Sequence, residues 1–284
     1  MFANNPFAGL PEFFSADIMQ GYIILMAILV AAGTILDMMH KKSAKYFFEN
    51  AEKAKANAKR TVSGGEKVGL AVGTVASEVL TSSEFCSTKR RISHLLTMYG
   101  FILFVASSAL MIFECETFAA STLATIWHVG AIMLCVGGYW FWFFIRVDVN
   151  SEGAKWYKLV RADIFIVSLF TTATFGLIWS YLQTNGGAVA DMGSTTLFFA
   201  LFAISNTTLF ASVLWSKFAH MFFKPAAAYQ KKTTVADGSK ENLPQDWDLS
   251  SAEVHEKFPD IPQYMGKNPE YMGHGIRRES PNHY

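Results

Sequence analysis

The last long apolar run of the chain ends in the sequence WSKFAHMFFKP, residues 215–225, in which a histidine stands between two lysines. An ionisable side chain inside an apolar run is costly to bury in hydrocarbon, so it usually faces the interior of a helix bundle and has a role there. Neutral imidazole is also a common ligand of haem iron. His220 is therefore either an axial haem ligand or an interfacial histidine that reaches water and headgroups beside Lys224.

The composition points to a membrane protein. Of the 284 residues, 51% are hydrophobic and only 17% are charged, which is too little charge for an ordinary soluble surface. At a rise of about 1.5 Å per residue, windows of roughly 20 apolar residues can cross a hydrocarbon core about 30 Å thick. Five windows meet this condition, at 18–36, 92–113, 119–145, 164–183 and 195–223. We therefore expect an all-α integral membrane protein, with an outer segment at 1–17 and a five-helix bundle within 18–225.

Lysine and arginine occur in alternate connections between these windows. The segments 1–17, 114–118 and 184–194 contain neither residue, whereas 41–91, 146–161 and 224–232 contain many. The positive-inside rule then places the N-terminus outside, and the 41–91 loop and the C-terminal tail in the cytoplasm. The basic block at 41–60 lies beside a span, so it favours contact with anionic membrane lipid and not with nucleic acid.

A second histidine matches the depth of the first. His94 follows Arg91 by three residues, and His220 precedes Lys224 by four, on windows that run in opposite directions. Each imidazole should lie about 4.5 to 6 Å inside its cation, on the cytoplasmic side. The alternative is a pair of unrelated interfacial histidines. The matched depth predicts one b-type haem on His94 and His220, and its propionates could be neutralised by Lys89, Arg90, Arg91 and Lys217.

His128 lies in the outward half of the third window, without a histidine partner at that depth. Three interpretations are open. It could exchange a proton with a quinone, because quinol oxidation needs a base. It could ligate a second haem together with Met111, or it could be a packing residue held by the hydroxyl of Ser107 or Ser108. His40, at the inner edge of the first window, is a reserve ligand.

Iron–sulfur chemistry would have to come from another protein. Cys86, Cys115 and Cys135 lie far apart, and no CxxC spacing for a cluster or a zinc ion occurs. The segment 226–284 is polar and rich in proline, with single aromatic residues among charges. Such a segment cannot build its own core. We expect an extended cytoplasmic tail that wraps around a partner, and simple disorder is the alternative.

The Ser216-Lys217-x-x-His220 segment, with Pro225 after it, resembles the haem-binding end of cytochrome b subunits related to the nitrate reductase gamma chain. Membrane subunits of the heterodisulfide-reductase type carry a similar segment, and within this group the chain resembles the membrane anchors of dissimilatory adenylylsulfate reductases. The likeness covers the five windows, including 91–94, and not the tail. Two-haem members have further histidines where this chain has none, at 101–106 and 197–205. The resemblance therefore supports only the inner haem, on His94 and His220.

This resemblance implies a multi-pass protein of a prokaryotic cytoplasmic (inner) membrane. The 226–284 tail and the 41–91 loop would hold a cytoplasmic iron–sulfur flavoprotein, similar to adenylylsulfate reductase, and haem b would link it to the quinone pool. The chain would be a non-catalytic or quinone-reactive subunit of an oxidoreductase complex in sulfur metabolism. Two alternatives are a haem-free anchor that only recruits the soluble enzyme and a gamma-type cytochrome b of another respiratory oxidoreductase. The direction of electron flow stays open.

Overall fold

The computed structural model describes residues 1–41, 43–85, 87–114, 119–149, 152–185, 192–241, 243 and 248–260. The described part contains helices and no strand. Five of its helices are long and apolar enough to cross a membrane, which confirms the predicted all-α, multi-pass bundle. They are α1 (Ala16–Lys41), α4 (Thr88–Ile112), α5 (Ala120–Trp140), α6 (Ile164–Asn185) and α7 (Met192–Ala211).

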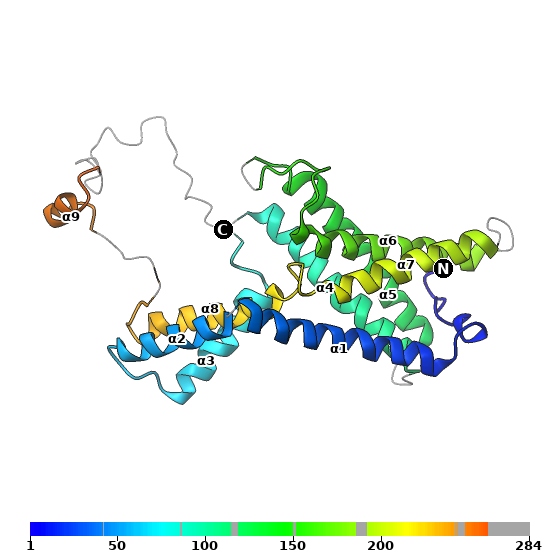
Figure 1. The fold of residues 1–284 in the computed structure, drawn as a ribbon, viewed down its shortest axis with the longest axis horizontal. Helices are drawn as coiled ribbons and strands as arrows, with labels where there is room; N and C mark the ends of the chain where they lie inside the picture. Colours follow the sequence, from blue (N-terminus) through cyan, green and yellow to red (C-terminus); the bar gives the residue numbers. More distant parts are fainter. Residues whose placement is uncertain are drawn as a thin grey trace.

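The bundle consists of two helical hairpins, α4–α5 and α6–α7, which meet where α5 packs against α6. Helix α1 runs along this four-helix unit and packs against α4 and α7 (Figure 1). Helices α4 and α5 cross at Gly100 and Gly130. A Cβ atom on Gly130 would lie 2.7 Å from the Phe104 nitrogen, and one on Gly100 would lie 2.9 Å from the Gly130 oxygen. Two glycines therefore allow the backbones to touch, a common device in membrane helix packing.

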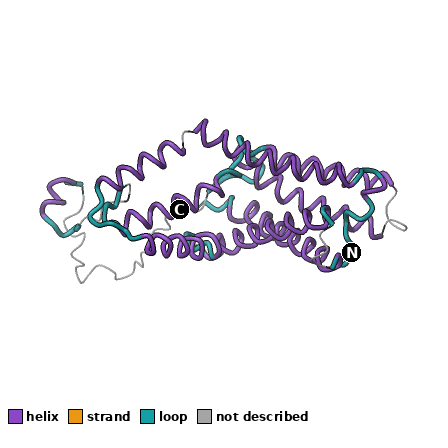
Figure 2. Tube along the Cα trace, turned by 90° about the horizontal axis from the view of Figure 1, so that it is seen from below, coloured by secondary structure: helices purple, strands orange, loops and turns teal. Residues whose placement is uncertain are grey.

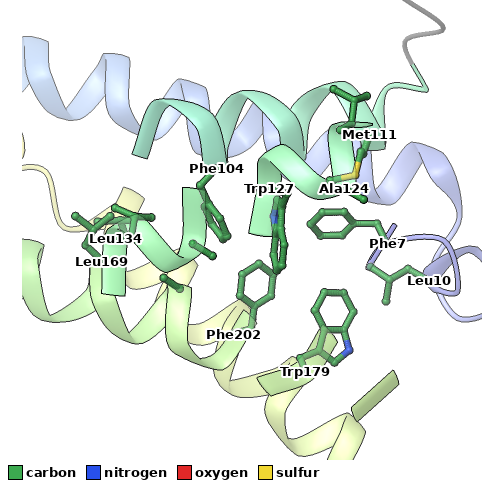
Figure 3. Packing of buried hydrophobic residues seen from close by; sticks show 14 of the residues in the cluster. Phe7, Leu10, Phe104, Met111, Ala124, Trp127, Leu134, Leu169, Trp179 and Phe202 are labelled. Atoms are coloured by element: carbon green, nitrogen blue, oxygen red, sulfur yellow. The ribbon is translucent and has the colours of Figure 1, made fainter. Parts of the chain in front are cut away.

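The core is built around Trp127 of α5, which is fully buried. Figure 3 shows its indole between Phe104 of α4 and Phe7 of the N-terminal segment, at ring-centroid distances of 4.9 and 6.0 Å. Its indole N–H donates to Ser108 Oγ at 2.9 Å. The predicted outer segment 1–17 is thus part of the core, because Phe7 and Leu10 are buried at the outer end of the bundle.

The fifth predicted window, 195–223, is too long. Helix α7 ends at Ala211, and a turn over 212–219 leads into α8 (His220–Ala236). Within the turn, the Ser216 hydroxyl oxygen accepts a hydrogen bond from the Phe218 N–H at 3.2 Å, a local contact that competes with helix continuation. The apolar residues of 212–219 lie in a largely buried turn, and those of 220–223 begin α8. Hydrophobic periodicity cannot distinguish this arrangement from one longer helix. His220 therefore begins a new helix and does not end a span.

A layer of helices extends beyond the end of the bundle where the basic connections lie, which we call the inner end. This inner platform consists of α2 (Ser43–Ala56), α3 (Gly64–Thr74), the π-helical turn η2 (Val75–Leu80) and α8 (Figures 1 and 2). Helix α8 packs on α2, α3 and η2. The first part of the predicted extended tail, from 226 to 236, is thus helical and docked. The remaining described elements are the short α9 (Ala252–Lys257), two 3₁₀ turns η1 (Leu10–Glu12) and η4 (Arg161–Asp163), and the π-helical turn η3 (Phe141–Ile145).

Candidate functional site

His94 lies in the second turn of α4, exposed at the inner end of the bundle. Its Nδ1 atom is 3.1 Å from Ser82 Oγ, and its ring lies 4.9 Å from the Phe85 ring. A hydrogen bond from Nδ1–H to an oxygen fixes the tautomer and the orientation of an imidazole, as it does for many metal-bound histidines. Nε2 makes no hydrogen bond to any described residue. The chemistry of this histidine therefore fits an axial ligand.

The loop that carries Ser82 is held against α4. Ser82 is fully buried and has a left-handed backbone conformation, with φ of 48°. The Arg91 Nε atom donates to the Thr81 carbonyl at 2.7 Å, and the Tyr99 hydroxyl donates to the Leu80 carbonyl at 2.7 Å. Arg91, a predicted propionate partner, is thus already engaged in positioning the loop beside His94.

Helix α8 reaches the same loop. Lys224 forms a salt bridge with Glu84, and its ammonium group lies 5.0 Å from the centre of the Phe85 ring. Arg90 lies 5.7 Å from the same ring and pairs with Glu152 at 3.2 Å. The beginning of α8 and the beginning of α4 are therefore joined through one loop, residues 81–85. We call Ser82, Glu84, Phe85, Arg90, His94 and Lys224 the His94 cluster.

The second predicted ligand is placed only in part. The backbone of His220 begins α8, but its side chain lies outside the described residues. Lys217 is exposed on the turn before it, and His40 is exposed near the inner end of α1. The shared loop brings the helices of His94 and His220 together, and the pairing of the two imidazoles on one iron stays a prediction.

The interior of the bundle at this depth is filled by aromatic rings. Phe218, only 2% exposed, lies 6.2 Å from Phe101 of α4, 5.2 Å from Phe165 of α6 and 6.1 Å from Phe210 of α7. We call these four residues the inner aromatic cluster. A haem on His94 would have to lie outside this cluster or displace Phe218.

His128 is fully buried between α5 and α6. Its Nδ1 lies 2.7 Å from the Ala124 carbonyl, which can only accept, so Nδ1 carries the hydrogen. Its Nε2 lies 2.8 Å from Ser180 Oγ, whose hydroxyl must then donate. The packing interpretation named a nearby hydroxyl such as that of Ser107 or Ser108, and the hydroxyl that contacts His128 belongs to Ser180 instead. Because both ring nitrogens are satisfied, contact with a quinone would require Ser180 to release Nε2; the quinone role of His128 stays a prediction.

A buried ion pair lies at the inner end of α5, and charge counting alone did not single it out. The Arg146 guanidinium, with 2% of its side chain exposed, donates to Asp163 Oδ2 at 2.6 Å and to the carbonyls of Lys155 and Lys158 at 2.9 and 2.7 Å. It also lies 4.2 Å from the Trp142 ring. Arg146 therefore pins the loop between α5 and α6. The only sequence signal for this pair was Asp163, the acidic residue immediately before the fourth apolar window.

The outer half of the bundle contains a cavity of about 360 Å³ between α1, α4 and α7. Its walls are almost entirely apolar, and the N-terminal segment contributes Phe7, Leu10 and Phe14. Such a space forms only when three helices and a terminal segment meet, so no single stretch of sequence predicts it.

Among the described residues, no group of three or more His, Cys, Asp and Glu side chains could hold a metal ion. Comparison of the chain with protein-family models, with curated proteins and with solved structures finds no match.

Proposed function

We propose that the chain is a membrane anchor and electron-transfer subunit. In this proposal it holds a soluble iron–sulfur flavoprotein, similar to adenylylsulfate reductase, on its inner platform and connects it to the membrane quinone pool through one b-type haem. The observation that carries the proposal is the junction at loop 81–85, where His94, its Ser82 partner and the start of α8 meet.

His94 is the described half of the ligand pair. The Ser82 Oγ atom lies 3.1 Å from His94 Nδ1. In this proposal Ser82 accepts the Nδ1–H, which would leave Nε2 for iron and keep the ring in one orientation. His220 would supply the second bond from the start of α8. Lys217 is exposed and would provide positive charge for propionates at this end. Arg90 and Lys224 would have to exchange their partners Glu152 and Glu84 to do the same. When bound, the haem would supply one-electron transfer between its ferric and ferrous states.

The inner platform is the surface proposed for the partner. Two aromatic side chains of α2, Tyr46 and Phe48, are 60% and 64% exposed, and Lys53 and Lys55 follow on the same helix. Aromatic residues surrounded by charge are typical of protein interfaces, where rings fill pockets on the partner. The remainder of the tail, which extends from the end of α8, would add further contacts.

A haem-free anchor is the second candidate, and the inner aromatic cluster favours it. Phe218 and its three neighbours fill the interior beside α4, α6 and α7, so the bundle is packed at this depth without a cofactor. In this version, the platform would recruit the soluble enzyme and His94 would only hold loop 81–85 in place.

Purification from native membranes tests both candidates. The first predicts a co-purifying flavoprotein together with about one b-type haem per chain, measured by flavin content and pyridine haemochrome. Flavoprotein without haem would favour the second candidate. Haem without flavoprotein would point to a cytochrome that serves another respiratory enzyme, and the absence of both would contradict the whole proposal.

A further inference from the structure

The outer cavity is bounded by three membrane helices and capped by the N-terminal segment. Phe104 and Phe199 form parts of its wall, and Phe7 and Phe14 close its outer end. Its volume of about 360 Å³ lies within the usual range for small-molecule sites, roughly 300 to 1,000 Å³, which are mostly apolar with a few polar groups. A hydrocarbon chain fits a cavity with such apolar walls at membrane depth.

Three polar residues line the cavity, Tyr22, Ser108 and Asn206, and two of them, Tyr22 and Asn206, belong to a chain of hydrogen bonds that ends on Thr207 outside the lining. The Thr207 hydroxyl donates to the Ala203 carbonyl at 2.7 Å, so it accepts from the Tyr22 hydroxyl at 2.9 Å. The Tyr22 oxygen in turn accepts from Asn206 Nδ2 at 3.0 Å. This chain of hydrogen bonds fixes the amide. Asn206 Oδ1 and the second N–H of Nδ2 have no hydrogen-bond partner among the residues that the structure describes.

The free amide atoms fit a neutral head group that carries oxygen. A carbonyl oxygen can accept the remaining N–H, and a hydroxyl can donate to Oδ1. The cavity lining contains no lysine or arginine, and neither do the outer segments 1–17, 114–118 and 184–194. A phosphate head group would therefore lack a counter-charge at this end of the bundle, which disfavours a phospholipid.

The geometry points to an isoprenoid quinone in this cavity, with its ring at Asn206 and its chain along the apolar wall. Phe210 lines the cavity and also belongs to the inner aromatic cluster, so the site extends from the outer end toward the His94 side. The inference rests on the proposed function for the identity of the ligand, and the binding itself requires no haem. It assigns the quinone contact to Asn206 and Tyr22, whereas the sequence suggested His128.

The test is quinone binding to the full chain in phosphatidylcholine nanodiscs. Decylubiquinone is titrated, and quenching of tryptophan fluorescence reports binding, because Trp127 and Trp179 pack against Phe104 and Phe202 of the cavity wall. Asn206→Leu removes the amide and is expected to raise Kd about tenfold, the equivalent of one hydrogen bond of about 1.4 kcal/mol. Ala109→Phe fills the cavity and should abolish saturable quenching.

The matched control is Ala32→Phe, which adds the same ring at an exposed position of α1 outside the cavity and should leave Kd unchanged. Thermal unfolding identifies any variant that fails to fold. If Ala109→Phe does not fold, the Kd of Asn206→Leu alone decides the test. Unchanged Kd in both cavity variants would overturn the inference. So would retention of a phospholipid, and no quinone, in native mass spectrometry of the purified chain. Quinone binding without any haem would instead contradict the proposed function and leave this site intact.

Discussion

At the scale of single residues, the largest loss of stability is expected from breaking the Arg146–Asp163 pair. Removal of one partner of a buried pair leaves an uncompensated charge and costs roughly 3 to 5 kcal/mol. Only 2% and 12% of the two side chains are exposed, and Asp163 also accepts the Val160 N–H at 2.9 Å. We therefore expect Asp163→Ala to lower the thermal unfolding temperature strongly in detergent.

The exposed Arg60–Glu66 pair provides the control for this prediction. Its side chains are 54% and 34% exposed, so water screens the interaction and Glu66→Ala should change the unfolding temperature little. Equal decreases in the unfolding temperature for Asp163→Ala and Glu66→Ala would show that burial does not determine how much the Arg146–Asp163 pair stabilises the fold.

The sequence located His94 correctly at the inner end of its helix but could not supply its partners. The depth of His94 follows from counting residues inward from Arg91. Ser82 lies twelve residues earlier, in a loop where it has a left-handed backbone conformation. A contact between such a loop residue and a helix cannot be predicted from hydrophobic periodicity. His128 was placed in the right window, but its hydroxyl partner is on α6, the helix that follows its own.

At the scale of elements, α4 and α5 depend on their glycine crossing. In Gly130→Ala the new methyl group would lie 2.7 Å from the Phe104 nitrogen, so the helices must separate. Forced repacking of this kind costs roughly 1 to 3 kcal/mol. The resulting loss of stability is measured by thermal unfolding of the purified Gly130→Ala variant.

Gly21→Ala is the matched control, because a Cβ atom on Gly21 of α1 meets nothing within 4 Å. Alanine favours helix over glycine by about 0.8 to 1 kcal/mol, so this variant should be slightly more stable than the parent. Destabilisation by Gly21→Ala as large as that by Gly130→Ala would contradict the role of close packing.

The attachment of α8 to η2 should weaken in acid. Burial raises the pKa of Glu78, but hydrogen bonds from Lys232 and Ser77 outweigh it and hold this pKa below its ordinary value of 4.5. A carboxyl group with a lowered folded-state pKa stabilises the fold above its unfolded pKa, and this contribution is lost as pH falls through the folded value. The hydrogen-exchange protection factors of α8, which are corrected for the pH dependence of intrinsic exchange, should therefore fall below about pH 4.5.

Glu78→Gln separates this effect from general acid unfolding. The variant should show faster exchange in α8 already at neutral pH, because the pair with Lys232 at 3.2 Å is lost, and a smaller further change in acid. The Glu84–Lys224 pair lies nearer the start of the same helix and is present in both proteins. Identical pH profiles for the parent and Glu78→Gln would rule out Glu78 as the acid-sensitive contact.

At the scale of the whole molecule, the sequence predicted the five helices of the described residues that are long and apolar enough to cross a membrane, because length and hydropathy alone determine this property. It placed the end of the last span wrongly. The turn at 212–219 buries Val213 and Phe218 as a helix would, so composition could not reveal the break. The platform was also missed in part, since the helical character of 226–236 appears only where α8 packs on α2 and α3.

The tail beyond α8 is expected to contribute to partner binding. Truncation after Gly238 removes the prolines and single aromatic residues but keeps all of α8 and its contacts with the platform. We expect the flavoprotein to be lost during purification while the bundle stays folded. Full retention would assign docking to the platform and the 41–91 loop alone.

The most direct measurement of the central claim is the reduced-minus-oxidised optical spectrum of the purified chain and its histidine variants. We expect a low-spin b-type spectrum in the parent and in His40→Ala, and its loss or conversion to a high-spin form in His94→Ala and in His220→Ala, since each removes one axial bond. Ser82→Ala, which removes only the orienting hydroxyl, should retain haem with a shifted midpoint potential. An unchanged low-spin spectrum in both His94→Ala and His220→Ala would contradict the account.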